Sequence, residues 1–83
     1  MKKHTKIYMN YHNYDISDWI ACEHCGTTAV DIHHLTGRGI GGSKNKDFIE
    51  NLIALCRRCH IKAETDKQFN NQLKELNKHK HSN

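Results

Sequence analysis

Two cysteine pairs constrain this chain more than any other feature of its sequence. Cys22 and Cys25 form one Cys-x-x-Cys unit, and Cys56 and Cys59 form the other. Each unit can direct two thiolates at one ion, and two units together complete a tetrahedral, all-thiolate zinc site. The residues between the pairs, 26–55, leave room for two strands. The pattern therefore predicts a structural zinc ion that closes this part of the chain into one unit.

Two other uses of four cysteines stay open at this point. A redox Cys-x-x-Cys motif normally accompanies a βαβ pattern, which the chain lacks. An iron–sulfur cluster is not excluded by four cysteines alone. A closed four-cysteine zinc site has no open coordination position, so any catalysis must come from other residues.

The composition predicts a single small domain. Because only 36% of its 83 residues are hydrophobic, this domain needs a stabilising cross-link such as the zinc site. The net charge of +4 favours a polyanionic partner such as nucleic acid, although solubility alone explains a charge of this size equally well. No apolar run is long enough to span a membrane, and no hydrophobic stretch follows the basic N-terminus. We therefore expect a cytoplasmic protein without a membrane partner, in which thiols stay reduced and bind metal.

Hydrophobic patterning divides the chain into three parts. Residues 1–21 are expected to form a largely helical segment on the core, in which a turn carries Trp19 and Ile20 inward. Residues 28–35 and 51–56 are short apolar runs typical of strands, and a helix begins at Arg57. The polar, glycine-bearing loop between the two strands is long enough to suggest a function.

The C-terminal part, residues 65–83, is expected to form a second helix with a frayed tail. Thr65 and Gln68 have the spacing of a capping box. Phe69, Leu73 and Leu76 then fall on one helical face. The segment from Asn77 onward contains no apolar anchor, which predicts fraying.

Three of the eight histidines stand out. His33 and His34 end the first expected strand, and His60 follows Cys59, so a zinc ion at the cysteines would fix its position. If the strands form a hairpin and the helix packs on it, the three rings could approach one point. The other histidines are expected at the surface, with His24 beside the zinc site rather than bound to it.

These residues resemble the HNH endonuclease family, whose core is the ββα-metal motif, also called the His-Me finger. The matching stretches are CEHCG, VDIHHLTGRG and ENLIALCRRCHIKAE within residues 22–64. In these stretches the histidine pair, Asn51 and His60 appear in the family's order around two zinc knuckles. The chain is most similar to small, stand-alone HNH proteins of bacteria and their phages. The resemblance implies a small, zinc-stapled α+β fold, with a ββα-metal core and flanking helices.

The resemblance also implies a role for each matching residue. His33 and His60 would bind a catalytic divalent metal, which could be Mg²⁺, Mn²⁺ or another transition metal. His34 would be the general base that activates water, and Asn51 would brace the loop near it. Some family members have a further metal-binding histidine where this chain has Glu64, which could ligate directly, through water or not at all.

One physical difficulty accompanies these roles. Neighbouring residues on a regular strand point to opposite faces. His33 and His34 can therefore share one site only if the strand ends or distorts there, and the glycines that follow make a break plausible.

The resemblance implies a DNA endonuclease of low sequence specificity in the cytoplasm of a bacterium or a phage-infected host. Such a nuclease would act with a homodimer mate or a phage partner protein if it cuts both strands. The cations expected to contact phosphates are Arg38, Lys44, Arg57 and Arg58. The alternative is a non-catalytic zinc module that binds nucleic acid or protein and keeps only the scaffold.

Overall fold

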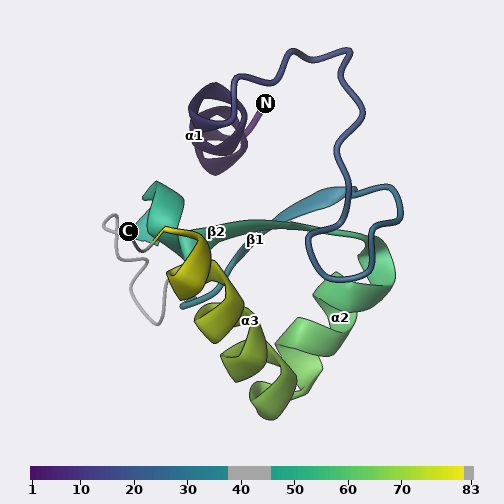
Figure 1. The fold of residues 1–83 in the computed structure, drawn as a ribbon, viewed down its shortest axis with the longest axis vertical. Coiled ribbons are helices and arrows are strands. Elements are labelled where there is room, and N and C mark those ends of the chain that lie inside the picture. The colour runs from purple at the N-terminus through teal and green to yellow at the C-terminus, as the bar shows by residue number, and fades with distance from the viewer. Residues whose placement is uncertain (38–45, 82–83) are drawn as a thin grey trace.

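The structure is a computed structural model that describes residues 1–37 and 46–81. It is a small α+β fold, as the sequence predicts. Its elements in chain order are α1 (Lys3–Tyr11), β1 (Asp31–His34), the 3-10 helix η2 (Ile49–Asn51), β2 (Leu52–Leu55), α2 (Arg57–Thr65) and α3 (Lys67–Lys80). In Figure 1, α1 lies on one side of the two-stranded sheet, and α2 and α3 lie on the other. No helix within the described residues is long and apolar enough to cross a membrane.

The two strands pair antiparallel, with His33 opposite Ile53 and His34 opposite Leu52. All four residues of β2 are buried, because helices cover both faces of the sheet. Alternate residues therefore enter different cores. Leu52 and Ala54 face the side of α1, whereas Ile53 packs toward α2 and α3.

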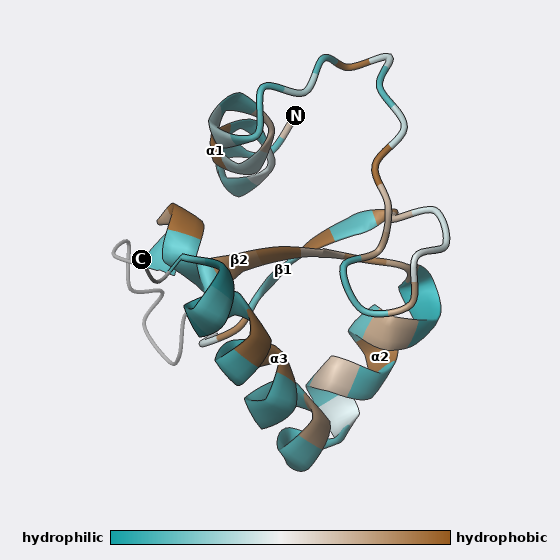
Figure 2. Ribbon diagram, viewed as in Figure 1, coloured by the Kyte–Doolittle hydropathy of each residue, from teal (hydrophilic) through white to brown (hydrophobic). Residues whose placement is uncertain are grey.

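The larger core lies between the sheet and the helices α2 and α3. Figure 2 shows the apolar residues of this sheet and of the adjoining helix faces. The buried members of this core are Cys22, Leu35, Ile53, Leu55, Cys59, Ala63, Phe69 and Leu73. Two of the four cysteines belong to this cluster, so a zinc ion bound there would be continuous with the hydrophobic core.

The smaller core joins the N-terminal segment to the other face of the sheet. Tyr8 of α1 is buried against Leu52 and Ala54, so this helix packs on the sheet. Ile20 is partly buried there. The expectation for Trp19 is wrong, because its side chain is 63% exposed and its indole N–H donates to the hydroxyl of Thr28 at 3.0 Å.

Helix α3 departs from the sequence prediction at its start. Thr65 belongs to α2, and the N-cap of α3 is Asp66, whose carboxylate accepts hydrogen bonds from the backbone N–H groups of Gln68 and Phe69. An aspartate competes well for this position because it accepts orphan N–H groups and complements the helix dipole.

The end of α3 also differs from the prediction. Leu76 is 45% exposed, and Asn77 is fully buried in its place. The helix continues through Lys80, so the expected fraying is wrong for residues 77–80, whereas residues 82–83 of that tail lie outside the described residues. Lys80 contributes to this order, because its ammonium group donates to the carboxylate of Glu23 at 2.8 Å.

Candidate functional site

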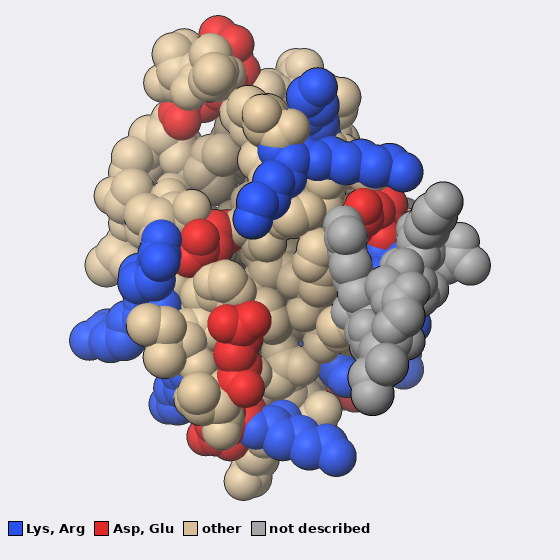
Figure 3. Space-filling view, turned by 180° about the vertical axis from the view of Figure 1, so that it is seen from behind, with Lys and Arg blue, Asp and Glu red and all other residues tan. Residues whose placement is uncertain are grey.

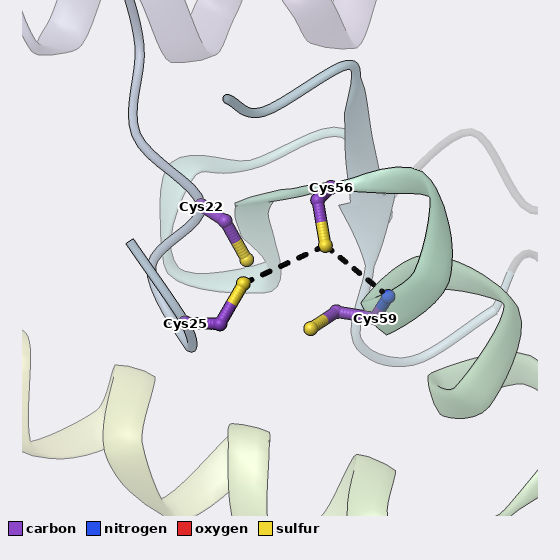
Figure 4. A group of neighbouring side chains, drawn as sticks. All are labelled: Cys22, Cys25, Cys56 and Cys59. Carbon is purple, nitrogen blue, oxygen red and sulfur yellow. Dashed lines mark hydrogen bonds between the residues drawn. The ribbon is translucent and has the colours of Figure 1, made fainter. Parts of the chain in front are cut away.

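The four cysteines converge as the sequence predicts. Figure 4 shows their sulfur atoms directed toward one another from two segments of the chain. One ligand atom from each of Cys22, Cys25, Cys56 and Cys59 lies within 4.8 Å of the others, and the sulfurs of Cys25 and Cys56 are 3.6 Å apart. A Zn–S bond of about 2.3 Å in tetrahedral geometry requires sulfur separations of about 3.8 Å. The arrangement therefore fits a structural zinc ion, and all four thiols are free of disulfide bonds.

Local backbone structure directs these thiols. In the first knuckle, Gly26 adopts a φ of +84°, a left-handed conformation that glycine takes without strain, and its N–H donates to the carbonyl of Cys22. In the second knuckle, Cys56 is the N-cap of α2, and its sulfur accepts the N–H of Cys59 at 3.4 Å. The helix N-terminus therefore favours a thiolate at this position.

The environments of the thiols differ in their effect on ionisation. The hydroxyl of Thr27 lowers the pKa of Cys25 to about 6. The backbone N–H of Cys59 lowers the pKa of Cys56. Burial raises the pKa of Cys59 itself to about 12. A bound zinc ion displaces the proton even from a thiol of raised pKa. The four cysteines together are therefore better suited to bind a cation than to remain free thiols.

His24 lies beside this group. Its Nδ1 atom is 3.6 Å from the sulfur of Cys59, and its ring packs edge-on against Phe69. The sequence expectation of a zinc-site neighbour agrees with this contact.

A second candidate metal group lies between β1 and α2. His33, His60 and Glu64 each offer a ligand atom within 4.8 Å of the others. The imidazole rings of His33 and His60 are 5.1 Å apart between centroids, and the carboxylate of Glu64 lies 3.7 Å from Nε2 of His60. The α2 helix places Glu64 here because residues four apart share a helical face. The structure thus brings together the two expected metal ligands and Glu64, whose role the sequence left open.

Asn70 of α3 orients the ring of His33. Its side-chain NH₂ donates to the carbonyl of Leu35 at 2.7 Å, and its oxygen lies 2.8 Å from Nε2 of His33. Because an amide oxygen only accepts, Nε2 of His33 must carry the hydrogen. Burial lowers the pKa of His33, which keeps the ring neutral. The lone pair is therefore on Nδ1, the nitrogen available to a cation.

Asp31 orients the ring of His60, as Asn70 orients that of His33. Its carboxylate lies 2.9 Å from Nδ1 of His60 and 3.2 Å from Nε of Arg57. A carboxylate beside one imidazole nitrogen favours the tautomer with hydrogen there, and leaves the other nitrogen to bind metal. In His60 that other nitrogen is Nε2, which faces Glu64.

His34 belongs to a different group of side chains. Its Nε2–H donates to the carboxylate of Asp47 at 2.7 Å, and its ring lies 4.4 Å from the ring of His4 between centroids. These three residues form another set with metal-ligand spacing. Strand β1 remains regular through His34, so His33 and His34 point to opposite faces. The expectation that all three histidine rings approach one point is therefore wrong.

One cleft nevertheless contains both sets of histidines. Its volume is about 710 Å³, and its lining includes residues 30–35, His4 of α1, His60 and Glu64 of α2 and Asn70 of α3. Because consecutive residues of β1 line it, the cleft runs along the edge of β1 that faces away from β2. Rings on both faces of the strand can therefore contact a single bound molecule.

Asn51 is buried and joins the two ends of the loop after β1. Its side-chain oxygen accepts the N–H of Thr36 at 2.8 Å, and its NH₂ donates to the carbonyls of Thr36 and Lys46 at 3.0 Å. Lys46 is followed directly by Asp47, the partner of His34. These are the bonds through which Asn51 would brace the loop, a role that stays a prediction.

The expected phosphate-binding cations divide into two groups. Arg38 and Lys44 lie outside the described residues. Arg57 and Arg58 are exposed at the start of α2, and Arg57 is also paired with Asp31. Figure 3 shows Lys and Arg side chains interspersed with Asp and Glu on one face, so this face carries no uniform basic surface.

A family model described as "Protein of unknown function (DUF968)" matches residues 2–77. The chain belongs to the DUF968 family. No curated protein matches it, and no solved structure does. The family match extends beyond the two cysteine pairs and includes α1 and most of α3.

Sequence reasoning missed three residues that line this cleft, and also Asp47, which contacts His34. Asn70 and Asp47 orient the two neighbouring histidines, Asp31 lies against His60, and His4 approaches from α1. Only Asn70 carried a usable signal, since it lies four positions after Asp66 and next to Phe69 on the helical face that packs inward. The other three come together through tertiary packing.

Proposed function

We propose that this DUF968 protein is a metal-dependent endonuclease of the HNH type that hydrolyses DNA phosphodiester bonds with low sequence specificity. β1, β2 and α2 would be its ββα-metal core, and the four cysteines would hold structural zinc. The observation that carries the proposal is the grouping of His33, His60 and Glu64 in the cleft that also contains His34. Two imidazoles and a carboxylate suit a divalent cation and leave positions for water and phosphate.

The proposed chemistry assigns a task to each of these side chains. A divalent cation would supply charge stabilisation at the phosphate and the leaving oxygen. His33 would hold it through Nδ1 and His60 through Nε2, the ring nitrogens that carry no hydrogen. His34 would accept a proton from the attacking water on Nδ1, because its Nε2–H is donated to Asp47. Asn51 would keep Asp47 in place through Lys46.

Nicking of supercoiled plasmid with Mg²⁺, Mn²⁺ or Ni²⁺ tests this proposal. We expect His34→Ala to reduce the rate by about 10²- to 10⁴-fold, the usual contribution of a general base. His79→Ala, an exposed histidine of α3, is the matched control and should retain full activity. His24 serves less well as a control because it touches Cys59. Equal rates for wild type and His34→Ala, or no nicking with any of the metals, would refute the proposal and favour a non-catalytic binding module.

A further inference from the structure

His4, His34 and Asp47 form a second set of metal-ligand spacing on the opposite face of β1. Each offers a ligand atom within 4.8 Å of the others. Asp47 is nearly buried, with 7% of its side chain exposed, and His34 is 17% exposed. The three residues come from three separate parts of the chain: α1, the end of β1 and the segment before η2. Their convergence therefore depends on the packing of α1 against the sheet.

The donors of this set repeat those of the first. His33, His60 and Glu64 supply two imidazoles and one carboxylate, and so do His4, His34 and Asp47. Two imidazoles with one carboxylate and open positions bind zinc and other transition metals. A hydrogen bond between a histidine and an aspartate needs no third residue. The ring of His4 nevertheless lies 4.4 Å from that of His34 between centroids, where it could serve as a third ligand.

We propose that His4, His34 and Asp47 bind a transition-metal ion such as Zn²⁺, and that this ion inhibits the protein. The inhibitory part rests on the proposed role of His34 as general base. Asp47 faces Nε2 of His34, so an ion held by both residues takes the place of the hydrogen between them. A neutral imidazole carries one hydrogen, which then moves to Nδ1. Nδ1 is the nitrogen that would accept the proton of water, so the bound ion leaves His34 unable to act as a base.

Zinc binding alone tests the site without any assay of activity. Protein that already contains one equivalent of zinc at the cysteines is titrated with Zn²⁺ by calorimetry. We expect two further equivalents to bind to the wild type, one at each set. His4→Ala should lose one, His60→Ala should lose the other, and the double variant should lose both. His79→Ala, with its exposed ring, should bind as the wild type does.

A second variant distinguishes loss of the metal site from loss of the fold. Asp47→Asn keeps a hydrogen-bonding side chain but removes the charge, and should also lose one equivalent, while circular dichroism checks that the helices persist. Uptake of the same number of zinc ions by His4→Ala, Asp47→Asn and wild type would overturn the site.

Inhibition is measured by adding Zn²⁺ to Mg²⁺-supported plasmid nicking. The rate of each protein with zinc is compared with its own rate without zinc. We expect His4→Ala to need more than about tenfold higher zinc for half inhibition, because it lacks one ligand. Equal inhibition of the two proteins would overturn the inhibitory role. If neither protein nicks DNA under any condition, the proposed nuclease function fails, and the zinc titration still decides the site.

Discussion

Nε2 of His33 lies 2.8 Å from the side-chain oxygen of Asn70, although 37 positions separate the two residues in the sequence. The contact joins β1 to α3, a helix that lies beyond the stretch of the chain that resembles the HNH core. Since Asn70 also donates to the carbonyl of Leu35, its oxygen cannot turn away from His33 without the loss of that bond. The helix α3 therefore sets which nitrogen of His33 can bind a cation.

Asn70→Ala should weaken Mn²⁺ binding at His33 and His60 by about 10- to 100-fold, the usual effect of removing a partner that orients a metal ligand. The exposed neighbour Asn71→Ala is the matched control and should bind as the wild type does. Calorimetry measures both, and heteronuclear NMR of the His33 ring reports its tautomer directly. An unchanged tautomer and affinity in Asn70→Ala would show that Asn70 serves packing alone.

Asn51→Ala should lower the free energy of unfolding by about 1–3 kcal/mol. The substitution removes the three hydrogen bonds that the buried side chain of Asn51 makes with the backbone of Thr36 and Lys46, and each such bond contributes about 0.5–1.5 kcal/mol. Urea denaturation measures the change. A loss below about 0.5 kcal/mol, the range of ordinary surface substitutions, would contradict the bracing role.

Asn77 and Leu76 offer a test of the buried face of α3. Asn77→Ala should destabilise the protein by about 1–3 kcal/mol, because the side-chain NH₂ donates to the carbonyl of Glu50 at 2.8 Å in a fully buried position. Leu76→Ala should cost less than about 0.5 kcal/mol, because its side chain is substantially exposed. Thermal denaturation of the two variants compares them, and the opposite order would place Leu76 in the core.

Removal of zinc should abolish the cooperative thermal transition of the protein. Cys22 and Cys59 belong to the main hydrophobic core, and a structural zinc site contributes its binding free energy to folding. Cys59→Ser should have the same effect as a strong chelator, whereas Ser17→Ala, an exposed site, should not. Circular dichroism during chelation measures the change. A chelated protein that keeps its melting transition would favour the redox interpretation of the cysteine pairs.

The two strands, the helix after Cys56 and the convergence of the four cysteines were all predictable. Each follows from local chemistry: the apolar runs at residues 28–35 and 51–56, and the spacing within each Cys-x-x-Cys unit. Two errors in α3 occurred where a polar side chain met a backbone hydrogen-bonding need that the hydrophobic pattern does not show. Asp66 replaced Thr65 as the cap of α3 because a carboxylate is the stronger acceptor at a helix start. Asn77 replaced Leu76 because two backbone carbonyls required a donor there.

The sequence by itself determined which donors are present and that His33 and His34 would point to opposite faces if the strand stayed regular. The structure shows that it does stay regular through His34. Only the tertiary structure decided which side chains meet each ring: Asn70 and His60 on one face, His4 and Asp47 on the other. The physical reason is that strand alternation is a local property of the backbone, whereas the partners of each face come from helices and segments distant in the chain. Their positions follow from how those elements bury their apolar residues.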